Sequence, residues 1–366
     1  MSERVTYSGP LIVVADDTPD LLNSQISEVT VCESQGGLAH AELRLQNTTE
    51  HDGHGIDFAF EYSDTDKLRL GTDLRILLPA RDAEADTDTP REVFAGRVSA
   101  LEINCTDGGF AELAVLAEDL LMPLRMHRRT RQWEGQPVRD LLAAISQDAG
   151  LGDPVTDYLA DEVITRHQVD ESDLAFLRRL LADWDADVQA VNGSLQVAPR
   201  ADLERGTLPL NYGTTLESVR IVADLAQQRA RYSLSAFNHL QGAPILAEMQ
   251  TTSLGPGEGE LAQAYLGNFG TTQMHRSGAP VTTQAEAQAM IDAIGARASR
   301  RFVQATGIAR GNPEIRVGTH LEIEGVGPRF ANTYYTTAAR HHFSAGTGYT
   351  TEFEAECAYF KGDIAA

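Results

Sequence analysis

The residues best suited to metal chemistry lie in His51-Asp52-Gly53-His54, where two imidazoles and a carboxylate occupy four positions. A catalytic zinc needs three protein ligands in fixed geometry, and a loop that contains glycine holds such ligands poorly. The sequence has no H-E-x-x-H helix that could complete the set. We therefore interpret His51 and His54 as part of a solvated loop, and we predict no metal site and no cofactor.

Other short motifs also depart from functional patterns. Residues 81–91 (RDAEADTDTPR) alternate carboxylates as a calcium loop does, but Thr87 replaces the glycine and Val93 replaces the closing Glu of such a loop. The glycines of LGPGEGELAQ follow no buried strand, so they are not typical of a phosphate-binding loop. There is no G-x-S-x-G and no cysteine in a nucleophile context. His341 and His342 fall on a predicted strand and point to opposite faces. We predict that the chain is not an enzyme.

Five glutamates alternate with apolar residues along two predicted strands near the C-terminus: Glu322, Glu324, Glu352, Glu354 and Glu356. Two interpretations stay open. A solvent-facing surface would place Arg340 and His342 opposite Glu352 and Glu354 as cross-strand pairs. An acidic wall would instead face a negatively charged molecule that must pass without binding.

Composition narrows the class of protein. The chain has 366 residues, of which 42% are hydrophobic, and its 53 acidic against 30 basic residues give a net charge of −23. It should not hold nucleic acid by its surface, because that affinity comes largely from Lys and Arg that neutralise phosphates. No segment approaches the roughly 18 apolar residues of a membrane span, and MSERVTYSGP lacks the apolar region of a secretory signal. Cys32, Cys105 and Cys357 are odd in number and far apart, so no disulfide framework is expected.

The predicted secondary structure changes along the chain from strands to helices and back to strands. Short alternating strands fill residues 10–118, and their number indicates a barrel or sandwich. Helices with good start and stop signals follow: Pro137–Ala149 ends at Gly150, and Thr283 and Glu286 form a capping box for a helix to about Val303. Strand patterns return at the end of the chain. We predict domains at 1–120, at 121–205 with 237–310, and at 206–236 with 311–366.

One phrase, VDESDLAFLRRLLADWDADVQAVNGSLQVAP, combines a helix with a hairpin. Asp170 and Ser172 are N-cap candidates, and leucines at helical spacing predict one buried face. Asn192-Gly193 is typical of a tight type I′ turn. Nothing in this unit resembles a catalytic apparatus.

Three stretches together resemble the phage late control D family, the baseplate hub proteins of contractile tails, which are related to the hub part of type VI secretion spike proteins. They are LAVLAEDLLMPLRMHRRTRQWEGQPVRDLLAAISQDAGL, VDESDLAFLRRLLADWDADVQAVNGSLQV and ARGNPEIRVGTHLEIEGVGPRFANTYYTTAARHHFSAGTGYTTEFEAE. They occur in the family's order and span nearly the whole chain.

The resemblance implies a β-rich α+β fold with two tube-like antiparallel barrels, one of them discontinuous, and a helix-containing middle domain. It implies a homotrimer that places six barrels in a ring between a hexameric tail tube and a trimeric central spike. Further expected partners are the tape measure and wedge or baseplate proteins, with no membrane partner. DNA would pass without specific binding, and the five glutamates would line the channel. The protein would be assembled in the host cytoplasm and located in the tail baseplate of the virion. Because the chain stops at Ala366, the spike would be a separate protein.

Two other functions remain as alternatives. A metal-dependent hydrolase would need His51 and His54 to find a third ligand in space. A cell-wall-binding β protein would bind its target as a monomer.

Overall fold

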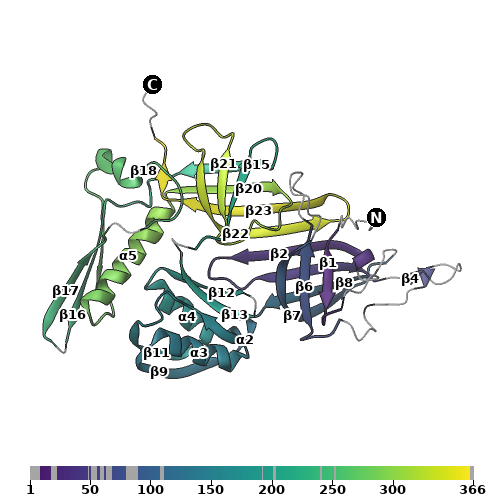
Figure 1. Cartoon of the computed structure of the whole chain (residues 1–366), viewed down its shortest axis with the longest axis horizontal. Helices are drawn as coiled ribbons and strands as arrows, with labels where there is room; N and C mark the ends of the chain where they lie inside the picture. Colours follow the sequence, from purple (N-terminus) through teal and green to yellow (C-terminus); the bar gives the residue numbers. More distant parts are fainter. Residues whose placement is uncertain are drawn as a thin grey trace, which may run out of the picture. The chain divides into compact units, whose positions relative to one another are not determined.

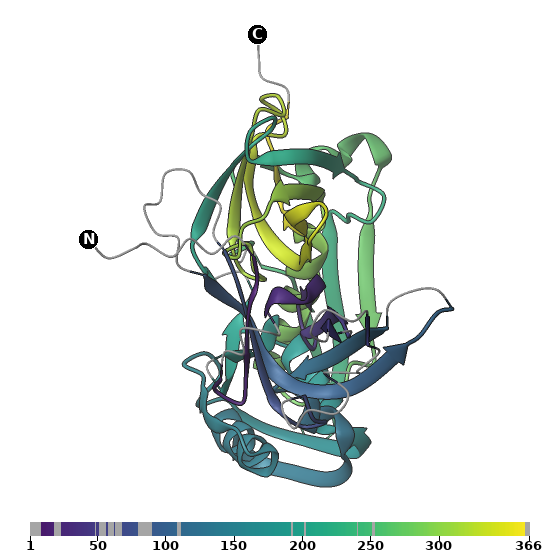
Figure 2. The ribbon, with the colours of Figure 1, turned by 90° about the vertical axis from the view of Figure 1, so that its right-hand side faces the viewer.

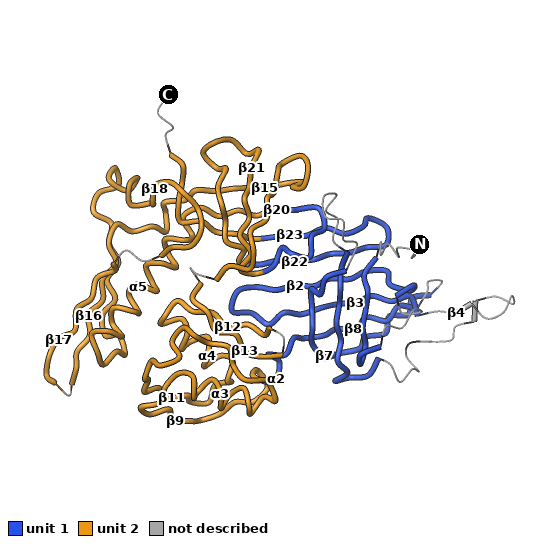
Figure 3. Tube along the Cα trace, viewed as in Figure 1, with its two compact units in different colours: residues 1–122, 308–316, 338–353 blue, residues 123–307, 317–337, 354–366 orange. Residues whose placement is uncertain are grey.

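The computed structural model describes residues 9–17, 23–47, 49–50, 56–57, 62, 68–79, 90–107, 111–191, 193–200, 203–239, 241–250 and 253–362. The chain divides into two compact units, which are coloured separately in Figure 3. Unit 1 contains residues 1–122, 308–316 and 338–353, and unit 2 contains residues 123–307, 317–337 and 354–366. Three strands contribute residues to both units: β20 (Val303–Arg310), β22 (Asn332–Ser344) and β23 (Gly348–Cys357).

Unit 1 is built from strands. Its sheet has the order β1-β6-β7-β8-β3-β2, and β2 pairs in turn with residues 338–344 of β22. Neighbouring strands of this sheet pair antiparallel to one another. The bounds are β1 Leu11–Val14, β2 Ile26–Ser34, β3 His40–Gln46, β4 Thr49–Glu50, β5 Ile56–Asp57, β6 Asp73–Leu78, β7 Arg91–Asn104 and β8 Glu112–Asp119.

Apolar alternation explains these strands. In β3, Ala41, Leu43 and Leu45 are buried while the residues between them are partly or fully exposed. The same period of two in β2 and β6 directs their apolar side chains into one core. Burying a Leu or Val side chain stabilises the fold by about 1.5–3 kcal/mol. The strands curl around this core, as Figure 2 shows.

The first part of unit 2 contains the predicted helix-hairpin phrase. Helix α4 (Asp173–Ala182) is capped by Ser172, whose Oγ accepts a hydrogen bond from the Ala175 N–H at 3.2 Å. The hairpin that follows has Gly193 at a φ of +80°. Other elements here are α2 Met122–Met126, β9 Arg128–Pro137, α3 Val138–Ala149, β10 Gly152–Val155, β11 Val163–Ser172, β12 Ala186–Val191 and β13 Ser194–Pro199. The helix predicted over Pro137–Ala149 is therefore confirmed within one residue, and the helix predicted in the phrase after Ser172 is confirmed as well.

A second part of unit 2 packs one helix against a small sheet (Figure 1). Helix α5 (Gln284–Arg300) begins with the predicted capping box, since Thr283 Oγ1 accepts from the Glu286 N–H and Glu286 Oε2 accepts from the Thr283 N–H. The sheet has the order β17-β16-β19. Its strands and the short elements between them are β16 Arg231–Asn238, β17 Ala243–Glu248, β18 Glu260–Leu261, η1 Ala262–Ala264, η2 Leu266–Phe269 and β19 Gln273–Ser277.

The remaining strands of unit 2 join segments that lie far apart in the sequence. β14 (Thr207–Asn211) pairs in parallel with β21 (His320–Glu324), and β21 pairs with β22. β15 (Leu216–Ala223) lies next to β20, and β24 (Tyr359–Phe360) pairs with β18. Two strands do not follow the predicted domain boundaries. Most of β16 was predicted to belong to the second barrel, but it pairs with β17 and β19. β20 was predicted to belong to the middle domain, but it is part of the large sheet. The β-rich α+β class is confirmed.

Burial does not alternate regularly along β22. In the part that belongs to unit 2, Tyr334, Tyr335 and Thr336 are all buried, whereas in the part that belongs to unit 1, Ala339 and His341 are buried and Arg340 between them is exposed. The set of residues that faces solvent therefore cannot be read from alternation alone. Among the described residues, no helix has the length and apolarity needed to cross a membrane.

Candidate functional site

The outward face of the unit 1 sheet is polar. We name it the unit 1 face and define it by Glu28, Thr30, Cys32, Glu42, Arg44, Glu112, Arg340, His342 and Glu352. Strand pairing aligns these residues in rows, because Arg44 lies opposite Glu28, and Glu42 lies opposite Thr30, which lies opposite His342. Their neighbours in sequence, such as Val29, Val31 and Leu43, fill the core.

Charges on the unit 1 face are partly neutralised. Arg44 forms ion pairs with Glu42 at 2.7 Å, Glu112 at 3.2 Å and Glu28 at 3.8 Å. The adjacent Glu42 carboxylate is the main reason that the pKa of Arg44 is raised. Arg340 contacts Glu352 at 3.4 Å, which confirms one of the two predicted cross-strand pairs. Four carboxylates nevertheless face two guanidinium groups, so the face keeps a negative excess.

His342 is placed differently from the second predicted pair. Its Nδ1 lies 3.5 Å from Glu28 and 3.2 Å from Thr30 Oγ1, both on β2. The cross-strand partner of His342 is thus Thr30 on β2. His341 points the other way and is fully buried, with Nδ1 2.8 Å from the Tyr349 hydroxyl. The two histidines do not converge, as predicted.

A second acidic surface lies in unit 2. We name it the unit 2 face and define it by Glu322, Glu324 and Glu354, which are all exposed. They alternate with buried Leu321, Ile323 and Phe353 or Ala355. None of the three carboxylates forms an ion pair with any residue that the structure describes, so their charges are uncompensated at this surface.

Glu356 differs from the other four predicted channel residues. Its side chain is buried and contacts Arg300 Nε at 3.2 Å, while Arg300 also donates two hydrogen bonds to Asp185 at 2.6 and 2.7 Å. We name Asp185, Arg300 and Glu356 the buried ion cluster. Burial would lower the pKa of Arg300, but the two carboxylates reverse this and raise it. Burial raises the pKa of Glu356 despite the neighbouring guanidinium. Its carboxylate is therefore not part of an exposed acidic surface.

Metal-binding geometry is not found in the described part of the chain, where no three His, Cys, Asp or Glu residues are grouped closely enough to hold an ion. His51, His54 and residues 81–89 lie outside the described residues, so the structure does not test their interpretation. Cys32 is half-buried, and desolvation raises its pKa although Arg340 lies nearby. A raised pKa disfavours the thiolate that a nucleophile requires.

The glutamates of β2, β3 and β8 were not among the predicted site residues. The stretches ISEVTV and AELRLQ were recognised as strands, and each carries glutamates at positions that alternate with the core residues. The polar residues that alternate with the core residues include Glu28 and Glu42, so the same pattern could have identified them. What the sequence could not show is that β2 pairs with β22, which brings these residues beside His342.

The fold is shared with phage tail proteins and with a secretion-system component. The 43 kDa tail protein of prophage MuSo2 from Shewanella oneidensis is 12% identical with a TM-score of 0.65, and the match covers 95% of this chain and 97% of that chain. The tail protein from Neisseria meningitidis MC58 gives the same identity and TM-score, with 95% and 96% covered. The E. coli c3393 protein, a type VI secretion component described as similar to T4 tail proteins gp27 and gp5, is 11% identical with a TM-score of 0.54, with 92% and 75% covered. The chain therefore has a phage tail protein fold.

By sequence, the chain belongs to the Alg8 N-terminal domain family, whose model matches residues 12–345. A comparison with curated proteins gives no match.

Proposed function

We propose that the chain is a structural baseplate hub of a contractile phage tail or a tail-like injection particle. In this role three copies form a ring that adapts a hexameric tail tube to a trimeric central spike, and a channel runs through the ring. The resemblance to the late control D family supports the hub role. The observation that carries the proposal is the match to tail proteins along 95% of the chain and nearly the whole length of those proteins.

The charge distribution supports a conduit. The unit 2 face presents three uncompensated carboxylates, and the unit 1 face keeps a negative excess. Lys and Arg on a channel wall would replace counterions on DNA and hold it, whereas carboxylates offer no such site. Repulsion extends over about 8 Å at physiological salt. We propose that Glu322, Glu324, Glu352 and Glu354 line or lie near the channel, and we leave the buried Glu356 out.

The proposed assembly is tested by mixing the full chain with the spike and tube proteins of its own particle. Light scattering should give a hub mass of three times 39.7 kDa in the complex with the spike. The chain alone is measured in parallel, because assembly can require the spike. A hub that remains monomeric when its spike is bound would refute the trimer.

The acidic wall is tested by reversing charge on the unit 2 face with Glu322→Lys, Glu324→Lys and Glu354→Lys together. DNA ejection, or cargo release in a particle without DNA, should slow while the ring still assembles. The matched control reverses three exposed acids on the helix-containing part of unit 2, Glu134, Asp153 and Asp157, and changes net charge equally. Equal rates for the two triple variants would contradict the wall.

A further inference from the structure

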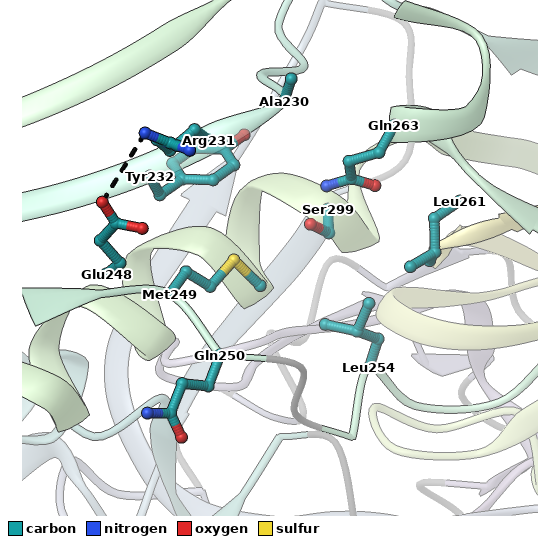
Figure 4. Close-up of a pocket in the computed structure, with 10 residues that line it drawn as sticks. All are labelled: Ala230, Arg231, Tyr232, Glu248, Met249, Gln250, Leu254, Leu261, Gln263 and Ser299. Atoms are coloured by element: carbon teal, nitrogen blue, oxygen red, sulfur yellow. Dashed lines mark ion pairs between the residues drawn. The ribbon is translucent and has the colours of Figure 1, made fainter.

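Unit 2 contains a pocket that is much larger than a single water molecule. Its walls include Tyr232, Met249, Leu254, Leu261, Gln263 and Ser299, and Figure 4 shows these side chains around one space. We name it the Tyr232 pocket. Its cavity volume of about 280 Å³ is far above the roughly 10–15 Å³ that one water molecule needs. It is slightly below the volume of typical small-ligand pockets, which measure about 300–1,000 Å³, so a small ligand would fit.

Three polar atoms of the wall have no hydrogen-bond partner among the described residues. They are the Tyr232 hydroxyl, the Ser299 hydroxyl and Gln263 Oε1, and Tyr232 and Ser299 are only 4% and 2% exposed. The three side chains come from β16, α5 and η1 and converge in Figure 4. A buried polar group without a partner costs about 1–3 kcal/mol, so a ligand that hydrogen-bonds to these atoms would gain affinity from them.

The Tyr232 hydroxyl is held in its neutral form. Burial is the main reason that the pKa of Tyr232 is raised. The phenol therefore keeps a proton that it can donate. Ser299 can donate or accept, and Gln263 Oε1 accepts. The pocket thus offers both donors and acceptors to a bound group.

The rest of the wall is apolar and neutral. Leu254 packs with Leu261 and Met249 in one hydrophobic cluster. Gly295 of α5 leaves room for Met249, because a Cβ there would lie 2.1 Å from the Met249 sulfur. Arg231 and Glu248 at the exposed rim pair with each other at 3.8 Å, so neither is a free charge for a ligand. Thioether sulfur and a tyrosine ring both contact aromatic rings favourably.

We propose that the Tyr232 pocket binds a neutral aromatic ring that carries a hydroxyl group, as a phenol does. The ring packs between Met249, Leu254 and Leu261, and the hydroxyl bonds to Tyr232, Ser299 and Gln263. A hydroxyl is both donor and acceptor, so it can satisfy several of these atoms at once. The phenol can come from a tyrosine of a partner polypeptide or from a free small molecule. This inference does not depend on the proposed hub assembly.

The test compares binding of p-cresol and toluene to the full chain by ligand-observed NMR. The two probes share a ring and a methyl group, and only p-cresol has the hydroxyl. p-Cresol should bind about three- to tenfold more tightly, the effect of one net hydrogen bond. Tyr232→Phe and Ser299→Ala should each remove most of this advantage, whereas the control Tyr212→Phe, at an exposed tyrosine, should not. Leu261→Trp should fill the pocket and abolish binding of both probes.

A second measurement separates ligand binding from folding. Tyr232→Phe and Ser299→Ala remove hydroxyls without partners, so the unliganded variants should unfold at the same urea concentration as wild type or at a higher one. N-acetyltyrosinamide distinguishes the two sources of phenol: it binds at least as tightly as p-cresol if the pocket accepts a tyrosine of a polypeptide, and more weakly if only a free phenol fits. Absence of p-cresol binding up to its solubility limit, or equal affinity for toluene that Tyr232→Phe leaves unchanged, overturns the proposal.

Discussion

Replacing Arg300 with Met should destabilise unit 2 strongly, because it removes the only positive charge of the buried ion cluster. The Arg300 side chain is 2% exposed, and those of Asp185 and Glu356 are 13% and 10% exposed. Its three hydrogen bonds connect the end of α5 with the residue before β12 and with the end of β23. Methionine occupies a similar volume, so the substitution tests charge more than packing.

The expected loss follows from what remains after the substitution. Two largely buried carboxylates would be left without their ion-pair partner, and breaking a buried ion pair in this way costs about 3–5 kcal/mol. That is a large part of the 5–15 kcal/mol by which folded domains are typically stable. Changing Glu356 to Gln in the same chain should recover part of the loss, since one of the two orphaned charges is then absent.

The loss should depend on pH in a defined direction. In the folded variant, burial raises the pKa of Glu356 and only the weaker effects of Arg200 and Arg301 oppose it, whereas the unfolded chain keeps the ordinary value of 4.5. A carboxyl group with a raised folded pKa stabilises the fold least at high pH, because the folded state must then lose its proton. Each pH unit contributes up to about 1.4 kcal/mol per carboxylate. The destabilisation should therefore be larger at pH 8 than at pH 5.

Urea unfolding followed by tryptophan fluorescence is a direct assay. Both tryptophans, Trp133 and Trp184, belong to unit 2, and Trp184 directly precedes Asp185. Arg178→Met is the matched control, because Arg178 is an exposed arginine of α4 and surface substitutions usually change stability by less than about 0.5 kcal/mol. A loss below about 1 kcal/mol for Arg300→Met, or a loss that is equal at pH 5 and pH 8, would refute the reasoning.

Three further outcomes are expected. Burial lowers the pKa of His341 to about 3, so the imidazole stays neutral in the folded protein, whereas the unfolded chain binds a proton there below about pH 6.5. The free energy of unfolding should therefore fall by about 2 kcal/mol from pH 7.5 to pH 5 because of His341. Chemical unfolding of His341→Gln should lack this component, and the exposed His127→Gln should keep it. Thr283→Ala should cost about 1 kcal/mol in urea unfolding of unit 2, since α5 loses its N-cap bond; an unchanged midpoint would contradict the role of the capping box. Gly257→Ala should destabilise by more than 1 kcal/mol, because its φ is +111° and an added Cβ would lie 2.5 Å from Cys357 Sγ; a thermal melt that matches wild type would show that the site can relax.

Local signals in the sequence predicted local structure well. Thr283 with Glu286, Ser172 before α4, and Pro137 with Gly150 around α3 all mark helix ends at their observed places. These signals work because capping depends on residues within one helical turn. The hairpin after α4 follows for the same reason, since a two-residue turn fixes its own register.

Strand partners could not be predicted in this way. β14 pairs with β21 across more than one hundred residues, and β16 pairs with β19 rather than with the large sheet. Short alternating stretches are equally compatible with several partners, so the choice is made by tertiary packing. This is why the strand RYSLSAF was assigned to the second barrel, whereas it forms the centre of the sheet that α5 covers.

The five predicted glutamates show what an alternating strand pattern can and cannot predict about a functional surface. Alternation correctly separates them from the core side of β21 and β23, but it says nothing about what covers the other side. Glu354 is exposed, and two residues further along the same strand Glu356 is enclosed by Arg300 of α5. A charge reversal at Glu356 would therefore unfold unit 2 before it could alter a channel. The proposed wall can be tested only with the exposed members, and the buried one belongs to the interactions that hold α5 to the sheet.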